Sequence, residues 1–241
     1  MTDKKIQLIT QMLAKAESTT PEEAEALTEH AERLMLKYSI DQAIIDAARG
    51  KAGQVKEVIV QEYMDFTGAY RGEMIHLSAC IISGLGNVRA LQSTAGGKVF
   101  RLFIVGFQSD VDQAKLLIAS LQVQSMVAVR SWWKANSAEF AGRSSYDQEK
   151  TRRSFVHGFG TGAGSRIRQN RVVIVEEAST DIGTAMVLVS RKDQLDVHMA
   201  ARKTKVARTR NATGGGSAGA QGFIAGQQAN TGGKAAKGVT S

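Results

Sequence analysis

The pattern of apolar and polar positions is clearest in the middle of the chain, where it predicts a buried strand followed by a long helix. Residues 99–107 are mostly β-branched and aromatic, a composition typical of a strand with little exposed surface. Over residues 111–133 the apolar side chains recur at helical spacing. Ser109 is the expected N-cap of this helix, with Asp110 and Asp112 in its first turn, where the helix dipole favours negative charge.

The opening of the chain has the three- and four-residue spacing of amphipathic helices. The expected helices cover residues 4–17, 20–38 and 41–48. Thr20 is expected to cap the second helix, because Pro21 occupies the first position and Glu23 completes a capping box. Ile44 and Ile45 are expected to face inward from the third helix.

The remaining elements are shorter and indicate a small sheet. Extended segments are expected at residues 55–63, 88–91, 99–107, 172–177 and 185–189, and helices at residues 70–85 and 191–203. A turn at residues 94–97 makes residues 88–107 a hairpin. Ser190 and Asp193 form a capping box for the last helix.

These elements predict an α+β fold. A three-helix module occupies residues 1–50, and an antiparallel or mixed sheet with helices on one face occupies residues 54–203. Residues 204–241 form a basic, Gly-rich tail that is expected to be mostly flexible.

The charge is unevenly distributed along the 241 residues. The formal net charge is +8, but residues 1–149 carry 16 Lys and Arg against 18 Asp and Glu, whereas residues 150–241 carry 15 against 5. The positive excess therefore lies in the second part, which favours a polyanionic partner, most often a nucleic acid. The alternative is a basic, solvated tail that improves solubility.

Cysteine content and hydropathy indicate in which cellular compartment the protein is expected. The single Cys80 excludes an intramolecular disulfide and a Cys-rich zinc site, and it is compatible with a reducing cytoplasm. No apolar run approaches the roughly 18–20 residues that span a bilayer, and the first residues lack a signal-peptide pattern. We expect a cytoplasmic protein that does not associate with membranes.

Basic side chains of the second part are the candidate nucleic-acid contacts. They are Arg152, Arg153, Arg166, Arg168, Arg171, Arg202, Lys203, Lys205, Arg208 and Arg210. Such cations contact phosphates, which positions a protein on nucleic acid without reading its sequence, so DNA and RNA remain equally open. Trp132, Trp133 and Tyr146 are either platforms for stacked bases or closures of the core.

A run of glycines lies between these arginines, at Gly158, Gly160, Gly162 and Gly164. It follows no clear strand and lacks both the Gly-Lys-Ser/Thr ending of a phosphate loop and the spacing of a dinucleotide site. The favoured interpretation is a weakened helix that packs closely against a neighbour, and the alternative is a true loop.

Candidate catalytic residues form no recognised constellation. Asp110 and Asp112 follow the central strand, but capping and dipole roles explain both. Glu73 and His76 have a spacing that can hold one metal, but the second Glu-x-x-His of a di-metal site is missing. Cys80 lies in an apolar run typical of a core. The case for an enzyme is therefore weak, and we expect no cofactor and no metal.

One stretch resembles a known family. The matching residues are Leu13, Ala14, Ala16, Glu17, Ser18, Pro21, Glu23, Ala24, Leu34, Met35, Lys37, Tyr38, Ile40 and Asp41. They resemble the opening of the bacterial and bacteriophage family called "domain of unknown function 2786", and the rest of the chain is more loosely similar to the second domain that usually follows. The resemblance implies a small-residue helix near residues 222–230 and an origin in bacteria or mobile elements, and it carries over no catalytic residue.

Three hypotheses follow for the function. The leading one is a non-catalytic nucleic-acid-binding accessory protein of a bacteriophage or other mobile element. The second is an interaction module that docks residues 1–50 on a host or phage protein. The third and least favoured is a metal-dependent hydrolase that uses Asp110, Asp112 or Glu73.

Overall fold

The computed structural model describes residues 8–9, 11–12, 15, 21–53, 56–92, 99–178, 180–202 and 216–229. In chain order the elements are α2 (Pro21–Lys51), β1 (Ile59–Phe66), α3 (Arg71–Leu85), β2 (Val88–Gln92), β3 (Phe100–Phe107), α4 (Gln108–Asn136), η1 (Ser137–Phe140), α5 (Ser145–Ala178), α6 (Ile182–Ala200) and α7 (Ser217–Gln228). The expected α+β class is confirmed.

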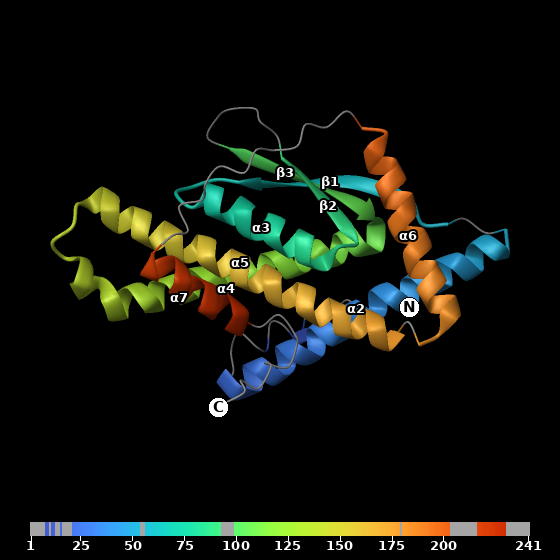
Figure 1. Cartoon of the computed structure of the whole chain (residues 1–241), viewed down its shortest axis with the longest axis horizontal. Helices are drawn as coiled ribbons and strands as arrows, with labels where there is room; N and C mark the ends of the chain where they lie inside the picture. The colour runs from blue at the N-terminus through green and yellow to red at the C-terminus, as the bar shows by residue number, and fades with distance from the viewer. Residues whose placement is uncertain are drawn as a thin grey trace.

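A three-stranded antiparallel sheet with the order β1-β3-β2 lies at the centre of the fold (Figure 1). The pairing of β2 with β3 confirms the expected hairpin. Leu102 and Ile104 of β3 are fully buried in the core that α3, α4 and α5 share with the sheet. On the opposite face, α6 is tied to the strands, because Asp196 accepts from Arg89 of β2 and Arg202 donates to Gln61 of β1.

Helices α4 and α5 form a long antiparallel hairpin. They have 29 and 34 residues, and they are joined by η1 and a short turn. Ser144 caps α5, since its hydroxyl accepts from the backbone N–H of Asp147 at 3.1 Å. Figure 1 shows that the hairpin runs past the end of the sheet, so that its turn projects from the body of the protein.

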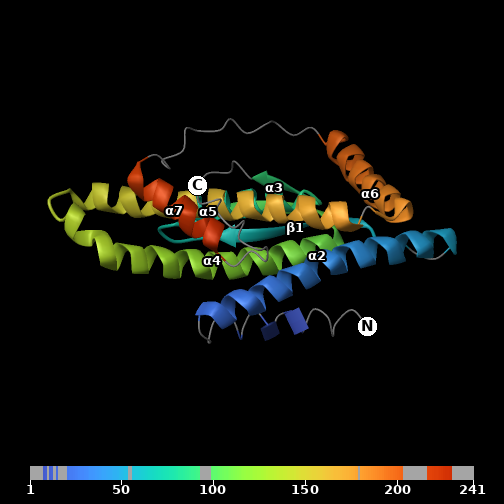
Figure 2. The ribbon, with the colours of Figure 1, turned by 60° about the horizontal axis from the view of Figure 1, so that its bottom comes forward.

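The N-terminal module differs from the expectation, because α2 is one continuous helix through Lys51. No glycine or proline interrupts residues 22–49, so Asp41 lies inside a helix instead of capping a third one. Ile44 and Ile45 were expected to face inward but are 39% and 42% exposed. Figure 2 shows α2 passing below α4 toward the end of the molecule where α6 lies. The expected helix at residues 4–17 and the cap at Thr20 lie mostly outside the described residues.

The glycine run is helical, which confirms the favoured interpretation. All four glycines lie inside α5 and alternate between two neighbours. A Cβ added to Gly160 or Gly164 would meet the backbone of α3, and one added to Gly158 or Gly162 would meet the backbone of α7. The glycines therefore let three helix backbones approach one another closely.

Three local predictions were wrong. Residues 172–177 and 185–189 belong to α5 and α6 and form no strand. Helix α6 begins at Ile182 and is capped by Asp181, not by Ser190, because Asp181 accepts from the backbone N–H of Thr184 at 2.8 Å. The cap of α4 comes from outside the helix, because Glu57 accepts from both the backbone N–H and the hydroxyl of Ser109.

Part of the expected tail is an ordered element. Residues 217–228 form α7, which lies against α5 with Ala218, Gly219, Gly222 and Gly226 buried. This position agrees with the small-residue helix that the family resemblance implied. The other residues of the tail lie outside the described residues. Among the described helices, none combines the length and the hydropathy that a membrane span requires.

Candidate functional site

The arginines predicted to bind nucleic acid do not share one surface. Arg166 is buried and donates to the backbone carbonyl of Gln227 at the end of α7. Arg153 pairs with Glu149 at 2.6 Å, and Arg168 donates to Ser83 at 2.9 Å. A helix with 3.6 residues per turn distributes these side chains around its axis.

The predicted contacts beyond α5 are described only in part. Arg202 lies just after α6, where it donates to Gln61 and bonds His198 at 2.9 Å. Lys203, Lys205, Arg208 and Arg210 lie outside the described residues.

A different basic surface lies at the turn of the α4–α5 hairpin. We call residues 130–152 the hairpin tip. Its cations are Arg130, Lys134, Arg143, Lys150 and Arg152, and its acidic residues are Glu139, Asp147 and Glu149. The five cations outnumber the three carboxylates, and one of these, Glu149, is paired with Arg153 outside the tip. The tip therefore presents an excess of positive charge to solvent.

Two stacked aromatic rings on this tip are flanked by two guanidinium groups. Trp133 stacks on Phe140, with ring centroids 5.5 Å apart and an interplanar angle of 22°. Arg143 lies 5.0 Å over Phe140, and Arg152 lies 4.8 Å over Trp133. The result is a four-membered stack with an arginine at each end, which we call the tip ladder.

Trp132 fits the interpretation as a closure of the core, and Tyr146 fits the interpretation as a stacking platform. Trp132 stacks on the buried Phe155 with centroids 4.9 Å apart and donates to Gln221 of α7, so it closes the core. Tyr146 is 74% exposed beside the turn, where a base could stack on it.

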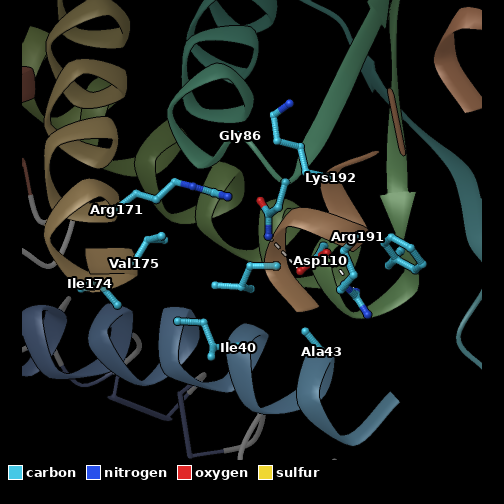
Figure 3. A pocket seen from close by; sticks show the side chains of 12 residues that line it. Ile40, Ala43, Gly86, Asp110, Arg171, Ile174, Val175, Arg191 and Lys192 are labelled. Atoms are coloured by element: carbon cyan, nitrogen blue, oxygen red, sulfur yellow. Dashed lines mark hydrogen bonds and ion pairs between the residues drawn. The ribbon is translucent and has the colours of Figure 1, made fainter. Parts of the chain in front are cut away.

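A second feature is a cavity of about 50 Å³ where α2, α5 and α6 meet the ends of α3 and β3 (Figure 3). It is lined by Ile40, Ala43, Gly86, Asn87, Phe107, Asp110, Arg171, Ile174, Val175, Leu188, Arg191 and Lys192. Sequence reasoning missed most of this site, because its members come from five elements that are far apart in the chain.

Arg191 holds one side of this cavity together. Its guanidinium lies 3.1 Å from Glu57, 3.1 Å from Asp110 and 3.7 Å from Asp46, with its carbon 3.8 Å over the ring of Phe107. Asp110 is only 3% exposed and also accepts from Asn87 at 2.8 Å. One cation thus connects α2, the segment before β1, α4 and α6.

Arg171 approaches the same cavity from α5. Figure 3 shows its side chain reaching across the space toward Asp110 and Arg191. Burial lowers its pKa, the charge of Asp110 opposes that change, and the charge of Arg89 adds to it. It makes no hydrogen bond or ion pair with any residue that the structure describes.

The seam between α3 and α5 gathers the remaining candidate catalytic residues. The rings of His76 and His157 stack with centroids 3.4 Å apart, and His76 Nε2 lies 3.4 Å from Cys80 Sγ and 3.1 Å from Thr161 Oγ1. Burial lowers the pKa of His76 to about 4, helped by His157, and burial raises the pKa of Cys80 to about 11. A protonated thiol is a poor nucleophile, which agrees with a packing role for Cys80.

The residues of the hydrolase hypothesis lie apart from one another. Asp110 faces the cavity, Asp112 accepts from Gln108 at 3.0 Å, and Glu73 lies 3.9 Å from Arg153 on another helix. Within the described part of the chain, no group of three His, Cys, Asp or Glu residues has the arrangement of a metal site.

Comparison with known proteins supports the family resemblance for one segment of the chain. Residues 9–42 match the family described as "Protein of unknown function (DUF2786)", which confirms the resemblance over that segment. No curated protein and no solved structure matches the chain significantly. The matching segment includes most of α2 and reaches the cavity at Ile40.

Proposed function

We propose that this protein, whose residues 9–42 match the DUF2786 family of unknown function, binds single-stranded nucleic acid through the hairpin tip. The observation that carries the proposal is the tip ladder, in which Arg143 and Arg152 flank the stacked rings of Phe140 and Trp133. Arg143 is exposed, so the face of its guanidinium plane that is turned away from Phe140 can stack on a base, whereas Arg152 is half-buried against Trp133.

The cations around the tip ladder are the proposed contacts to the phosphate backbone. Arg130, Lys134 and Lys150 are exposed and form no ion pair with a described residue. Their ammonium and guanidinium groups can therefore follow a phosphate backbone while bases stack beside them. Because neither contact reads base edges, the proposed binding has little sequence preference.

Fluorescence anisotropy with labelled single-stranded DNA, single-stranded RNA and duplex DNA tests this proposal. The variant replaces Arg143, Lys150 and Arg152 with Gln. The matched control replaces Lys37, Arg49 and Lys51 of α2 with Gln, which changes the net charge equally on another exposed surface. We expect the tip variant to lose most of its affinity and the control to keep it.

The salt dependence makes the test quantitative. Each lost phosphate contact on a single strand lowers the slope of log K against log salt by about 0.7, so the loss of Lys150, the one proposed phosphate contact among the three replaced residues, lowers it by about 0.7. Equal losses in both variants would show that only net charge matters and would overturn the assignment to the tip. Tighter binding to the duplex would contradict the stacking mechanism.

The second candidate is a protein-binding surface on the N-terminal helix. Ile44 and Ile45 are adjacent, exposed and apolar on α2, which is the one structural observation that favours it. If this hypothesis holds, replacing both with Ser should abolish co-purification of a specific partner from the host. Origin in a bacteriophage or mobile element stays a prediction from the family resemblance.

A further inference from the structure

Helix α6 carries a line of apolar side chains that no described element covers. We call its four members the α6 stripe, and their exposed fractions are 77% for Ile182, 69% for Met186, 59% for Val189 and 71% for Val197. With 3.6 residues per turn, these positions fall on one side of the helix. The opposite side is turned to the body of the protein, since Thr184, Arg191 and Leu195 are buried there.

The α6 stripe borders a groove between α6 and the start of β1. The groove has a volume of about 810 Å³, and Ile59 of β1 lines it together with Ala185, Met186 and Val189. Figure 1 places α6 at the end of the molecule opposite the turn of the α4–α5 hairpin. A partner bound at this groove would therefore leave the hairpin tip free.

The first half of α6 is apolar on both sides. Residues 185–189 are an unbroken apolar run, which is why they suggested a strand. Leu188 of this run lines the cavity toward α2 and α5, whereas Met186 and Val189 are exposed on the other side. A helix that is apolar all round is typically buried on all sides. The outer side of α6 therefore has the composition of an interface.

We propose that the α6 stripe joins two copies of this chain in a twofold-symmetric dimer. A twofold interface brings the same patch of both copies together, so the patch must be complementary to itself. Ile182 precedes Val189 by seven residues, and Val197 follows it by eight. If the axis passes beside Val189, two antiparallel α6 helices place Ile182 opposite the partner's Val197, and the stripe meets itself along its whole length.

The apolar area of the stripe matches what a stable dimer needs. A mostly exposed Val, Ile or Met side chain presents roughly 100 Å² of apolar surface, so the stripe presents roughly 400 Å² on each copy. Stable interfaces bury about 600–1,000 Å² per partner, of which a little over half, or about 350–550 Å², is apolar. Asp193 lies in the same line as the stripe, and burial of its carboxylate weakens the association.

Size-exclusion chromatography with light scattering, in the absence of nucleic acid, tests this proposal. The chain has a mass of 25.9 kDa, and we expect twice that mass at a concentration of about 100 μM. Val189→Glu should raise the Kd of the dimer at least about tenfold, because it places a charge beside the axis in both copies. Val127→Glu on α4, where the side chain is 56% exposed, is the matched control and should dimerise like the wild type.

Two further variants separate loss of the interface from loss of the fold. Asp193→Ala should lower the Kd, a gain that misfolding cannot produce. Val189→Cys should form a disulfide-linked dimer under mild oxidation, whereas Val197→Cys should not, because antiparallel helices place its two copies about 22 Å apart along the helix axes. The wild type, which contains only Cys80, should stay unlinked.

Several results would overturn the proposal. A wild type with a mass of 25.9 kDa at about 100 μM would mean that the stripe has another occupant, such as a different protein. Equal dissociation of Val189→Glu and Val127→Glu would place the contact elsewhere, and linkage at Val197 as efficient as at Val189 would exclude the antiparallel arrangement. None of these measurements involves nucleic acid, so their outcome is independent of the binding proposed for the hairpin tip.

Discussion

Replacing Gly164 with Ala should destabilise the protein, although Ala is the better helix former. The substitution lies inside α5, where the difference in helix propensity favours Ala by about 1 kcal/mol. An added Cβ, however, would lie 2.6 Å from the backbone carbonyl oxygen of Cys80 and 2.9 Å from its Cβ. Ordinary contacts begin at 3.4 Å, so α3 and α5 would have to separate by nearly 1 Å.

That separation cannot be absorbed by rotating a side chain, because the obstacle is backbone. On the other side of the crossing, a Cβ on Gly84 of α3 would lie 2.6 Å from the carbonyl oxygen of Gly164, so the contact is tight in both directions. Overpacking of this kind costs about 1–3 kcal/mol. Subtracting the gain in propensity, we expect Gly164→Ala to lower the free energy of unfolding by up to about 2 kcal/mol, and to leave it about 1–3 kcal/mol below the value that the propensity gain alone would give.

Urea unfolding followed by circular dichroism measures this difference. Gly72→Ala in α3 is the matched control, since the nearest atom to its added Cβ is a Phe100 ring carbon at 3.9 Å. The control should be neutral or stabilising by up to about 1 kcal/mol. A Gly164→Ala variant stabilised as much as the control would refute the close packing of α3 on α5.

Three further predictions concern buried polar groups. Arg191→Met should lower the free energy of unfolding by about 3–5 kcal/mol, because it leaves Asp110 and Glu57 without their cation. In the same urea titration, loss of the exposed Arg101–Asp65 pair in Arg101→Met should cost much less, because solvent screens that pair. Because burial lowers the pKa of His76 from 6.5 to about 4, its neutral form stabilises the fold above pH 6.5, and this contribution is lost as pH falls toward 4. The melting temperature of the wild type should therefore fall relative to His76→Gln over that range, and parallel pH profiles would contradict the assignment. Cys80, whose pKa is raised to about 11 by burial, should react slowly with iodoacetamide at pH 8 until denaturant is added, and rapid alkylation of the native protein would show an exposed thiol.

The elements with the strongest patterns were predictable from the sequence. The strand at residues 100–107 and the helix that follows were expected from β-branched composition and helical spacing, and α3 ends at residue 85 as expected, followed by Gly86 at a positive φ of 67°. The errors arose where local signals were ambiguous. Val172 and Val173 suggested a strand, but they lie exposed on the last turns of α5, where no neighbouring strand offers hydrogen bonds.

The candidate sites were harder to predict, because they depend on three-dimensional proximity. Arg191 meets Glu57 and Asp110 from residues 134 and 81 positions away, a separation that no periodicity reveals. The cations of the hairpin tip left a weaker signal that could have been found. Three of the five precede residue 150. The net charge of residues 1–149 therefore did not reveal them, because the acidic side chains of α2 offset their charge.

The geometry of α5 separates the hairpin tip from the cavity and makes the tip assignment testable with a distant cation on the same helix. Arg152 at the tip and Arg171 in the cavity are nineteen residues apart on one continuous helix, a distance of about 28 Å along its axis. Screening at physiological salt makes direct electrostatic coupling over that distance weak. Arg171→Met should therefore leave nucleic-acid binding unchanged in the anisotropy assay. A loss of affinity in Arg171→Met as large as in the tip variant would mean that the tip is not the binding surface.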